Sequence, residues 1–125
     1  MDSCLLRFYF MAALLHITSK QEAETAKSSG VYKPNNFNNE GFIHCSYPNQ
    51  VCCVANRLFK GSTDLVLLEI DKTQLTCEVI DEDLYESGEL FPHIYGELPW
   101  ETVMAVHDFP CSKNGEFKLP TLVSI

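Results

Sequence analysis

The stretch Asp64-Leu65-Val66-Leu67-Leu68-Glu69-Ile70-Asp71 decides the fold class of this chain of 125 residues. Its nearly continuous aliphatic run predicts a β-strand that is buried on both faces, at the centre of a sheet. Shorter apolar runs predict further strands at 12–17, 77–80 and 103–108. The central strand therefore has candidate partners on both sides of it along the chain.

Two helices are predicted before this strand. Ser19 and Glu22 have the spacing of a capping box, and Gly30 suits the position just past a helix end, which predicts a helix over 19–29. Pro48 suits a first helical turn, and the apolar residues that follow recur at helical spacing, which predicts a helix over 48–59.

The remaining segments read as connections. The Asn-rich segment 31–39 is expected to be irregular, and the acidic segment 81–88 to be turn-like. Pro92 makes 91–96 an edge strand or a loop, because proline has no N–H to donate to a sheet. Residues 99–102 suit one helical turn. Helices first and strands afterwards predict an α+β fold, with two helices against one or two small, mixed, mainly antiparallel sheets.

The composition fits one domain, with 46% hydrophobic and 21% charged residues. We expect this domain to span 12–110, with an N-terminal extension over 1–11 and a C-terminal tail over 111–125 that frays. Ordered-looking sequence begins near Met11, so either Met1 or Met11 is a candidate for the natural start. The apolar run 5–15 is too short to span a bilayer and is interrupted by Arg7, so no membrane association is expected.

The net charge of −8 repels phosphate backbones, so nucleic acid is not expected as the main partner. Arg57 and Lys60 form a local basic spot that suits a single phosphate, although a solvated helix face explains them more simply. The six cysteines contain no Cys-x-x-Cys pair. We interpret them as reduced and mostly buried, which is typical of a cytoplasmic protein.

Histidines are the main candidate functional residues. His16, His44 and His93 follow apolar residues near predicted strand ends, and His107 lies in the last predicted strand. A histidine at a strand end makes hydrogen bonds from a rigid backbone and titrates near neutral pH. Each is also interpretable as a structural histidine. A three-histidine metal site and a Cys45–histidine nucleophile are alternatives, although neighbours on a strand, such as His44 and Cys45, point to opposite faces.

An acidic segment surrounds Tyr85, with Glu82, Asp83, Glu86 and Glu89 close to it. The simplest interpretation is a solvated acidic loop. Glu89 stands apart because an apolar segment follows it, and such a setting suits a carboxylate that binds a substrate hydroxyl or a cation.

Six short motifs occur in a fixed order along the chain. They are His16-Ile17-Thr18, Glu40-Gly41-Phe42-Ile43-His44-Cys45-Ser46, Ala55-Asn56-Arg57, the stretch 64–71, Glu82-Asp83-Leu84-Tyr85 and Glu89-Leu90-Phe91-Pro92-His93-Ile94-Tyr95-Gly96. Together they resemble the domain-of-unknown-function family 952 (DUF952) over about residues 14–109. The resemblance implies a distant similarity to the ADP-ribosyltransferase-like fold, whose members bind NAD in a cleft between two small sheets.

The same resemblance implies roles by position. His16 with Thr18 matches the first-strand motif that holds the nicotinamide ribose, and His44 with Ser46 matches the motif on the nicotinamide side. His93 is our choice for the third catalytic position. Glu89 is the weaker candidate there, although many active transferases have a glutamate at this position.

The first function that the sequence predicts is an enzyme that handles NAD or ADP-ribose, with a small-molecule nucleotide as partner, NAD as possible substrate and no metal. The aromatic residues that could stack on nicotinamide are Tyr32, Phe42, Tyr85 and Tyr95, and Arg57 could bind a phosphate. A non-catalytic ligand-binding or interaction module on the same fold is the first alternative. A metal-dependent hydrolase that uses the three histidines is the second.

Overall fold

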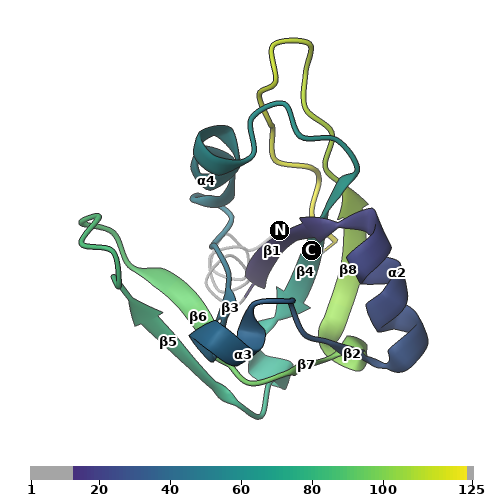
Figure 1. The fold of residues 1–125 in the computed structure, drawn as a ribbon, viewed down its shortest axis with the longest axis vertical. Helices are drawn as coiled ribbons and strands as arrows, with labels where there is room; N and C mark the ends of the chain where they lie inside the picture. The colour runs from purple at the N-terminus through teal and green to yellow at the C-terminus, as the bar shows by residue number, and fades with distance from the viewer. Residues whose placement is uncertain (1–12, 124–125) are drawn as a thin grey trace, which may run out of the picture.

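A computed structural model of the chain describes residues 13–123 (Figure 1). The expected N-terminal extension, and with it the choice between Met1 and Met11, lies outside these residues. The elements, in chain order, are β1 (Ala13–Ser19), α2 (Lys20–Ser29), β2 (Val31–Tyr32), α3 (Phe37–Glu40), β3 (Ile43–His44), α4 (Val51–Leu58), β4 (Leu65–Asp71), η1 (Lys72–Gln74), β5 (Glu78–Glu82), β6 (Phe91–Tyr95), β7 (Leu98–Pro99), η2 (Trp100–Thr102) and β8 (Val103–Asp108). The architecture is α+β, as the sequence predicts. Every strand pair among residues 13–123 is antiparallel, whereas mixed, mainly antiparallel sheets were expected. No helix among residues 13–123 is long and apolar enough to cross a membrane.

The first sheet has the order β1-β4-β8, with β4 in the middle. Val66, Leu68 and Ile70 on β4 face one apolar core, which also contains residues of α2. Leu67 faces a second core on the opposite side of the sheet, which contains residues of α4. The predicted central strand with two buried faces is therefore confirmed.

Local sequence signals place α2 correctly. The Ser19 side chain accepts a hydrogen bond from the N–H of Glu22 at 3.0 Å, and Gly30 ends the helix with φ at +90°. The carboxylate of Glu22 does not complete the capping box, because it accepts a hydrogen bond from the Thr18 hydroxyl at 2.7 Å instead. This difference links α2 to the candidate site.

The prediction of an edge strand or loop at 91–96 is wrong, because β6 is the middle strand of a sheet with the order β3-β6-β5. The N–H of Cys45 donates to the carbonyl of Pro92 at 3.0 Å. Pro92 has no N–H with which to return the second bond of this pair, and the regular ladder with β3 stops there. The sheet therefore accommodates the proline at the end of a short neighbouring strand.

Several predicted boundaries also need correction. The segment 31–39 is not irregular throughout, because it contains β2 and most of α3. Residues 13–123 therefore form three α-helices rather than the two expected. Strand β2 pairs with β7, about 65 residues further along the chain, and no local pattern reveals such a partner. Helix α4 begins at Val51 rather than Pro48, because residues 48–50 form a turn. The strand predicted at 77–80 extends to Glu82.

The segment after Pro110 packs on the domain and does not fray over its whole length. Phe117 is buried against Phe109, with 4.8 Å between the ring centroids. Its N–H donates to Asn56 Oδ1 at 2.7 Å, and the carbonyl of Gly115 accepts from the N–H of Gly61 at 3.1 Å. Residues 111–117 thus form part of the second core and its cover.

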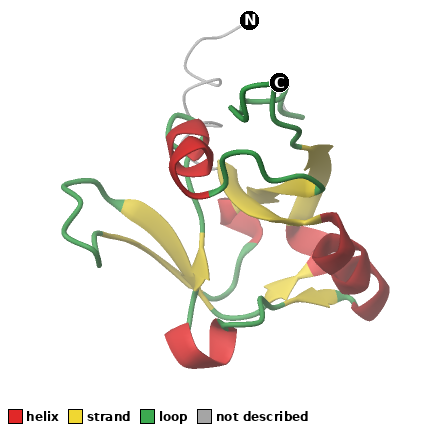
Figure 2. Ribbon diagram, turned by 45° about the horizontal axis from the view of Figure 1, so that its top comes forward, coloured by secondary structure: helices red, strands yellow, loops and turns green. Residues whose placement is uncertain are grey.

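One short segment joins the two larger sheets. His44 lies opposite His93 on β6, whereas Ser46 exchanges two backbone hydrogen bonds with Leu15 on β1, each 2.8 Å long. Residues 43–46 therefore pair with one sheet at their start and with the other at their end. Figures 1 and 2 show the β5–β6 hairpin extending away from the first sheet. Beyond Leu15, the outer edge of β1 has no partner strand among residues 13–123.

Candidate functional site

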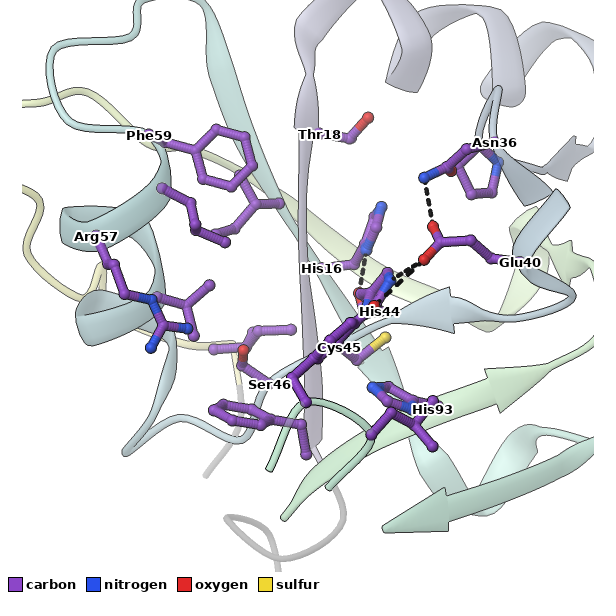
Figure 3. A pocket seen from close by; sticks show the side chains of 18 of the residues that line it. His16, Thr18, Asn36, Glu40, His44, Cys45, Ser46, Arg57, Phe59 and His93 are labelled. Atoms are coloured by element: carbon purple, nitrogen blue, oxygen red, sulfur yellow. Dashed lines mark hydrogen bonds and ion pairs between the residues drawn. The ribbon is translucent and has the colours of Figure 1, made fainter. Parts of the chain in front are cut away.

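A cavity of about 1000 Å³ opens where the two sheets diverge. The three predicted histidines, His16 on β1, His44 on β3 and His93 on β6, all line it. The other predicted site residues that line it are Thr18, Tyr32, Ser46, Arg57 and Tyr85. Figure 3 shows Arg57 on one side of the cavity, and Glu40 and His93 on the other. The structure thus brings together histidines that are as many as 77 residues apart in the sequence.

His16 is held at both ring nitrogens. Nδ1 lies 2.5 Å from the carbonyl oxygen of His44, and Nε2 lies 2.8 Å from the Tyr32 hydroxyl. Burial lowers the pKa of His16 to about 4, so the imidazole is neutral at neutral pH. A carbonyl only accepts, so Nδ1 carries the proton, and Nε2 accepts one from Tyr32.

A chain of polar groups continues from Tyr32 to the carboxylate of Glu22. The Tyr32 hydroxyl lies 3.0 Å from Thr18 Oγ1, and the Thr18 hydroxyl donates to Glu22 Oε2 at 2.7 Å. Burial raises the pKa of Tyr32, which keeps its hydroxyl protonated. The network therefore fixes the neutral form and the orientation of His16.

His44 pairs with a carboxylate four residues before it. Its Nε2 donates to Glu40 Oε2 at 2.8 Å, and Asn36 donates to the other oxygen of the same carboxylate. The Tyr85 hydroxyl reaches Glu40 Oε2 at 3.4 Å, and the Tyr85 and His44 rings are nearly parallel at 6.1 Å. Tyr85 and His44 thus present neighbouring ring surfaces at the cavity.

His93 pairs with a carboxylate on the neighbouring strand. Its Nδ1 lies 3.0 Å from Glu82 Oε1, which also accepts a hydrogen bond from the Tyr95 hydroxyl. The hydrogen bond from Tyr95, and to a lesser extent the one from His93, lowers the pKa of Glu82 below its ordinary value. The hydrogen bond to the same carboxylate raises the pKa of Tyr95 to about 12. The ring of Phe42 stacks on His93 at 4.4 Å. Phe42 therefore packs on His93, whereas Tyr95 holds the carboxylate that pairs with it, and neither Phe42 nor Tyr95 lines the cavity.

Glu89, the weaker catalytic candidate, does not reach the cavity. Its carboxylate accepts a hydrogen bond from Gln50 Nε2 at 3.0 Å, which ties the β5–β6 loop to the segment before α4. His107 also lies elsewhere, with its Nε2 2.6 Å from the buried carboxylate of Glu69. Neither residue lines the cavity.

The thiol of Cys45 packs in the first apolar core, and burial raises its pKa far above the ordinary value. A thiol in this state is a poor nucleophile. The five described cysteines are all free, as expected, but only Cys45 is buried, and Cys53 is exposed. The expectation of mostly buried cysteines was therefore wrong.

Three glutamates at the cavity, Glu22, Glu40 and Glu82, were not predicted as site residues. The signal for Glu40 was its place four residues before His44, across a turn at Gly41. Glu82 was assigned to an acidic loop because the predicted strand stopped too early. On the observed register it lies diagonally across from His93, within reach of its side chain.

The edge of β1 that has no partner within residues 13–123 adds backbone groups to the site. Leu15 exchanges its backbone hydrogen bonds with Ser46, so its N–H and C=O point away from β4. Along a strand these directions repeat at every second residue, so the N–H and C=O of Ile17 also point outward. Ile17 lines the cavity. The backbone N–H and C=O of Ile17 can therefore pair with a ligand group that both accepts and donates a hydrogen bond.

The described residues 13–123 contain no group of three or more His, Cys, Asp or Glu side chains arranged to hold a metal ion. Both nitrogens of His16 are already hydrogen-bonded within the protein. A metal centre built on His16, His44 and His93 would require His16 to break these bonds.

The family model described as "Protein of unknown function (DUF952)" matches residues 17–106, well over half of the chain. The chain belongs to the DUF952 family. None of the curated proteins matches it.

Solved structures of a protein named CC0527 from Caulobacter crescentus have the same fold as this DUF952 member. In the crystal structure of CC0527, the sequence is 29% identical to this chain and the TM-score is 0.77. The match covers 86% of this chain and 94% of CC0527. Its solution NMR structure is 29% identical, with a TM-score of 0.68, over 84% and 90% of the two chains.

Proposed function

We propose that the cavity binds NAD or ADP-ribose, and that the protein is an enzyme acting on the bond between nicotinamide and ribose. The observation that carries this proposal is the convergence of His16, His44 and His93, from three strands of two sheets, on one cavity. A cleft between two small sheets is also what the resemblance to the ADP-ribosyltransferase-like fold implies. The volume of about 1000 Å³ is at the upper end of the usual range for ligand sites.

The edge of β1 supports a nicotinamide position. A carboxamide has both an N–H donor and a carbonyl acceptor, which complement the outward C=O and N–H of Ile17. The rings of Tyr85 and His44 offer stacking surfaces for the pyridine ring. His16 and Thr18 are close to this edge, where the nicotinamide ribose would lie.

The charges of the cavity suit the two ends of such a ligand. Arg57 on α4 can bind a phosphate, whereas Glu40 lies at the opposite side (Figure 3). Glu82 lines the cavity beside its partner His93. Cleavage of the glycosidic bond develops positive charge on the ribose, as in glycoside hydrolysis, and a nearby carboxylate stabilises that charge. Neutral histidines alone cannot supply this charge. The paired glutamates behind His44 and His93 can.

Calorimetric titration with ADP-ribose, nicotinamide and NAD tests the proposal. We expect ADP-ribose to bind with a dissociation constant of roughly 1 μM to 1 mM. The variant Arg57→Gln should weaken ADP-ribose binding about tenfold and leave nicotinamide binding unchanged, because the lost cation is worth about 1.4 kcal/mol at a phosphate. Lys60→Gln is the matched control, since Lys60 is exposed on the same chain segment and does not line the cavity.

Absence of binding by all three compounds at millimolar concentration would remove the proposal. Release of nicotinamide from NAD, followed by chromatography, separates an enzyme from a binding module. Binding without release would leave the fold as a non-catalytic nucleotide-binding module.

A further inference from the structure

The end of the cavity opposite Arg57 is built from two carboxylates and three rings. We call it the ring corner, and it consists of Glu40, His44, Glu82, Tyr85 and His93. We infer that the ring corner binds a protonated amine that carries an aromatic or apolar group. This goes beyond the proposed function and does not rest on it, because such an amine can bind whether or not a nucleotide occupies the rest of the cavity.

The first step is the charge of the cavity wall. Among residues 13–123, four carboxylates line the cavity, from Glu22, Glu40, Glu82 and Asp83, and one guanidinium, from Arg57. Hydrogen bonds from Tyr95 and His93 lower the pKa of Glu82, and those from the backbone of Ser87 and Gly88 help to lower that of Asp83. Both groups are therefore ionised at neutral pH. A wall with this excess of negative charge attracts cations.

The second step is an unused acceptor on a buried side chain. His93 is only 2% exposed. A carboxylate only accepts, so Nδ1 of His93 carries the proton that binds Glu82, and Nε2 of the neutral ring has a free lone pair. None of the described residues donates a hydrogen bond to this Nε2, although His93 lines the cavity. A ligand N–H would satisfy it.

The third step is the surface that surrounds these acceptors. The rings of His44 and His93 meet edge to face at 5.0 Å, and Tyr85 lies nearly parallel to His44. Ring faces attract ammonium groups within about 6 Å. At the cavity wall, Leu58 is 64% exposed and Leu84 is 49% exposed. These side chains offer contact to an apolar group attached to the amine.

Three small probes separate charge from hydrogen bonding. Benzylammonium carries a charge and N–H donors, benzyltrimethylammonium carries a charge without N–H, and benzyl alcohol carries a donor without charge. At pH 8, where an ordinary imidazole is neutral, we expect benzylammonium to bind about tenfold more tightly than benzyl alcohol. Benzyltrimethylammonium should bind with intermediate affinity, because it cannot donate to His93 Nε2. Amide and imidazole NMR signals report both the affinity and the location.

Matched variants assign the site. Glu82→Gln and Glu40→Gln should each weaken benzylammonium severalfold and leave benzyl alcohol unchanged, because only the charge is removed. Glu101→Gln is the control, since Glu101 is exposed and does not line the cavity. Circular dichroism and thermal unfolding establish that the variants are folded.

Equal affinity for benzylammonium and benzyl alcohol, or no binding of any probe to the folded protein, would overturn the inference. So would signal changes that avoid His44, Tyr85 and His93. ADP-ribose titrated into the same samples keeps the two proposals separate: amine binding without ADP-ribose binding would remove only the proposed function. ADP-ribose binding without amine selectivity would remove only the ring-corner site.

Discussion

His16 ties two separate elements to β1 through its two ring nitrogens. Nδ1 donates to the backbone of β3, and Nε2 accepts from Tyr32 of β2. Burial makes the imidazolium form costly, which is why its pKa falls to about 4. The residue therefore has a structural role in addition to its place at the cavity.

The low pKa of His16 predicts an acid-sensitive fold. The unfolded chain takes up a proton near the ordinary pKa of 6.5, whereas the folded chain does so only near 4. The contribution of neutral His16 to the free energy of unfolding is therefore fully present above pH 6.5, and it is lost as the pH falls towards 4. Its size is about 3 kcal/mol.

Denaturant unfolding of the wild type and of His16→Gln at pH 7 and pH 4 measures this contribution. Between pH 7 and pH 4, the free energy of unfolding should fall in both proteins, and the fall should be about 3 kcal/mol smaller in His16→Gln than in the wild type. The comparison between the two proteins removes the effect of carboxylates that titrate in the same range. Equal losses in both proteins would show that His16 titrates normally in the folded state.

Two other histidines show what sequence patterns can and cannot predict about a site. His44 and His93 were predicted as site residues, because their types and motifs are visible in the chain. Their partners Glu40 and Glu82 were not, because each contact depends on a turn or on a strand register. A shift of one residue in the register of a strand would turn the side chains of that strand to the other face of the sheet.

At the scale of elements, signals within about ten residues gave correct predictions. The Ser19 cap and Gly30 placed α2, and the aliphatic run placed β4 in the middle of its sheet. Pairings between distant segments were not predictable in this way. Strand β2 is recognisable only by its partner β7, and the middle position of β6 depends on how the ladder ends at Pro92.

The segment after β8 gives a prediction at the same scale. Phe117 is 4% exposed in the second core, so Phe117→Ala should destabilise the domain by about 3 kcal/mol through lost burial and a cavity. Leu119→Ala should change the free energy of unfolding by less than about 0.5 kcal/mol, because Leu119 is exposed. Urea unfolding curves of both variants provide the comparison. Equal and small effects would mean that this segment does not belong to the folded unit.

At the scale of the whole molecule, the cavity exists because two sheets share one short segment and then diverge. Ser46 joins that segment to β1 at Leu15, and beyond this point the edge of β1 pairs with no other strand in the described part of the chain. The divergence places three histidines and three paired or hydrogen-bonded glutamates around one space. We propose that these groups form one ligand site.

Histidine imidazole NMR signals, followed during titration with ADP-ribose, test that claim most directly. His16, His44 and His93 should shift along one common saturation curve, because they line the same cavity. His107 is the internal control, since it is paired with Glu69 away from the cavity and should not move. Unchanged signals from all three cavity histidines, or equal movement of His107, would contradict the account.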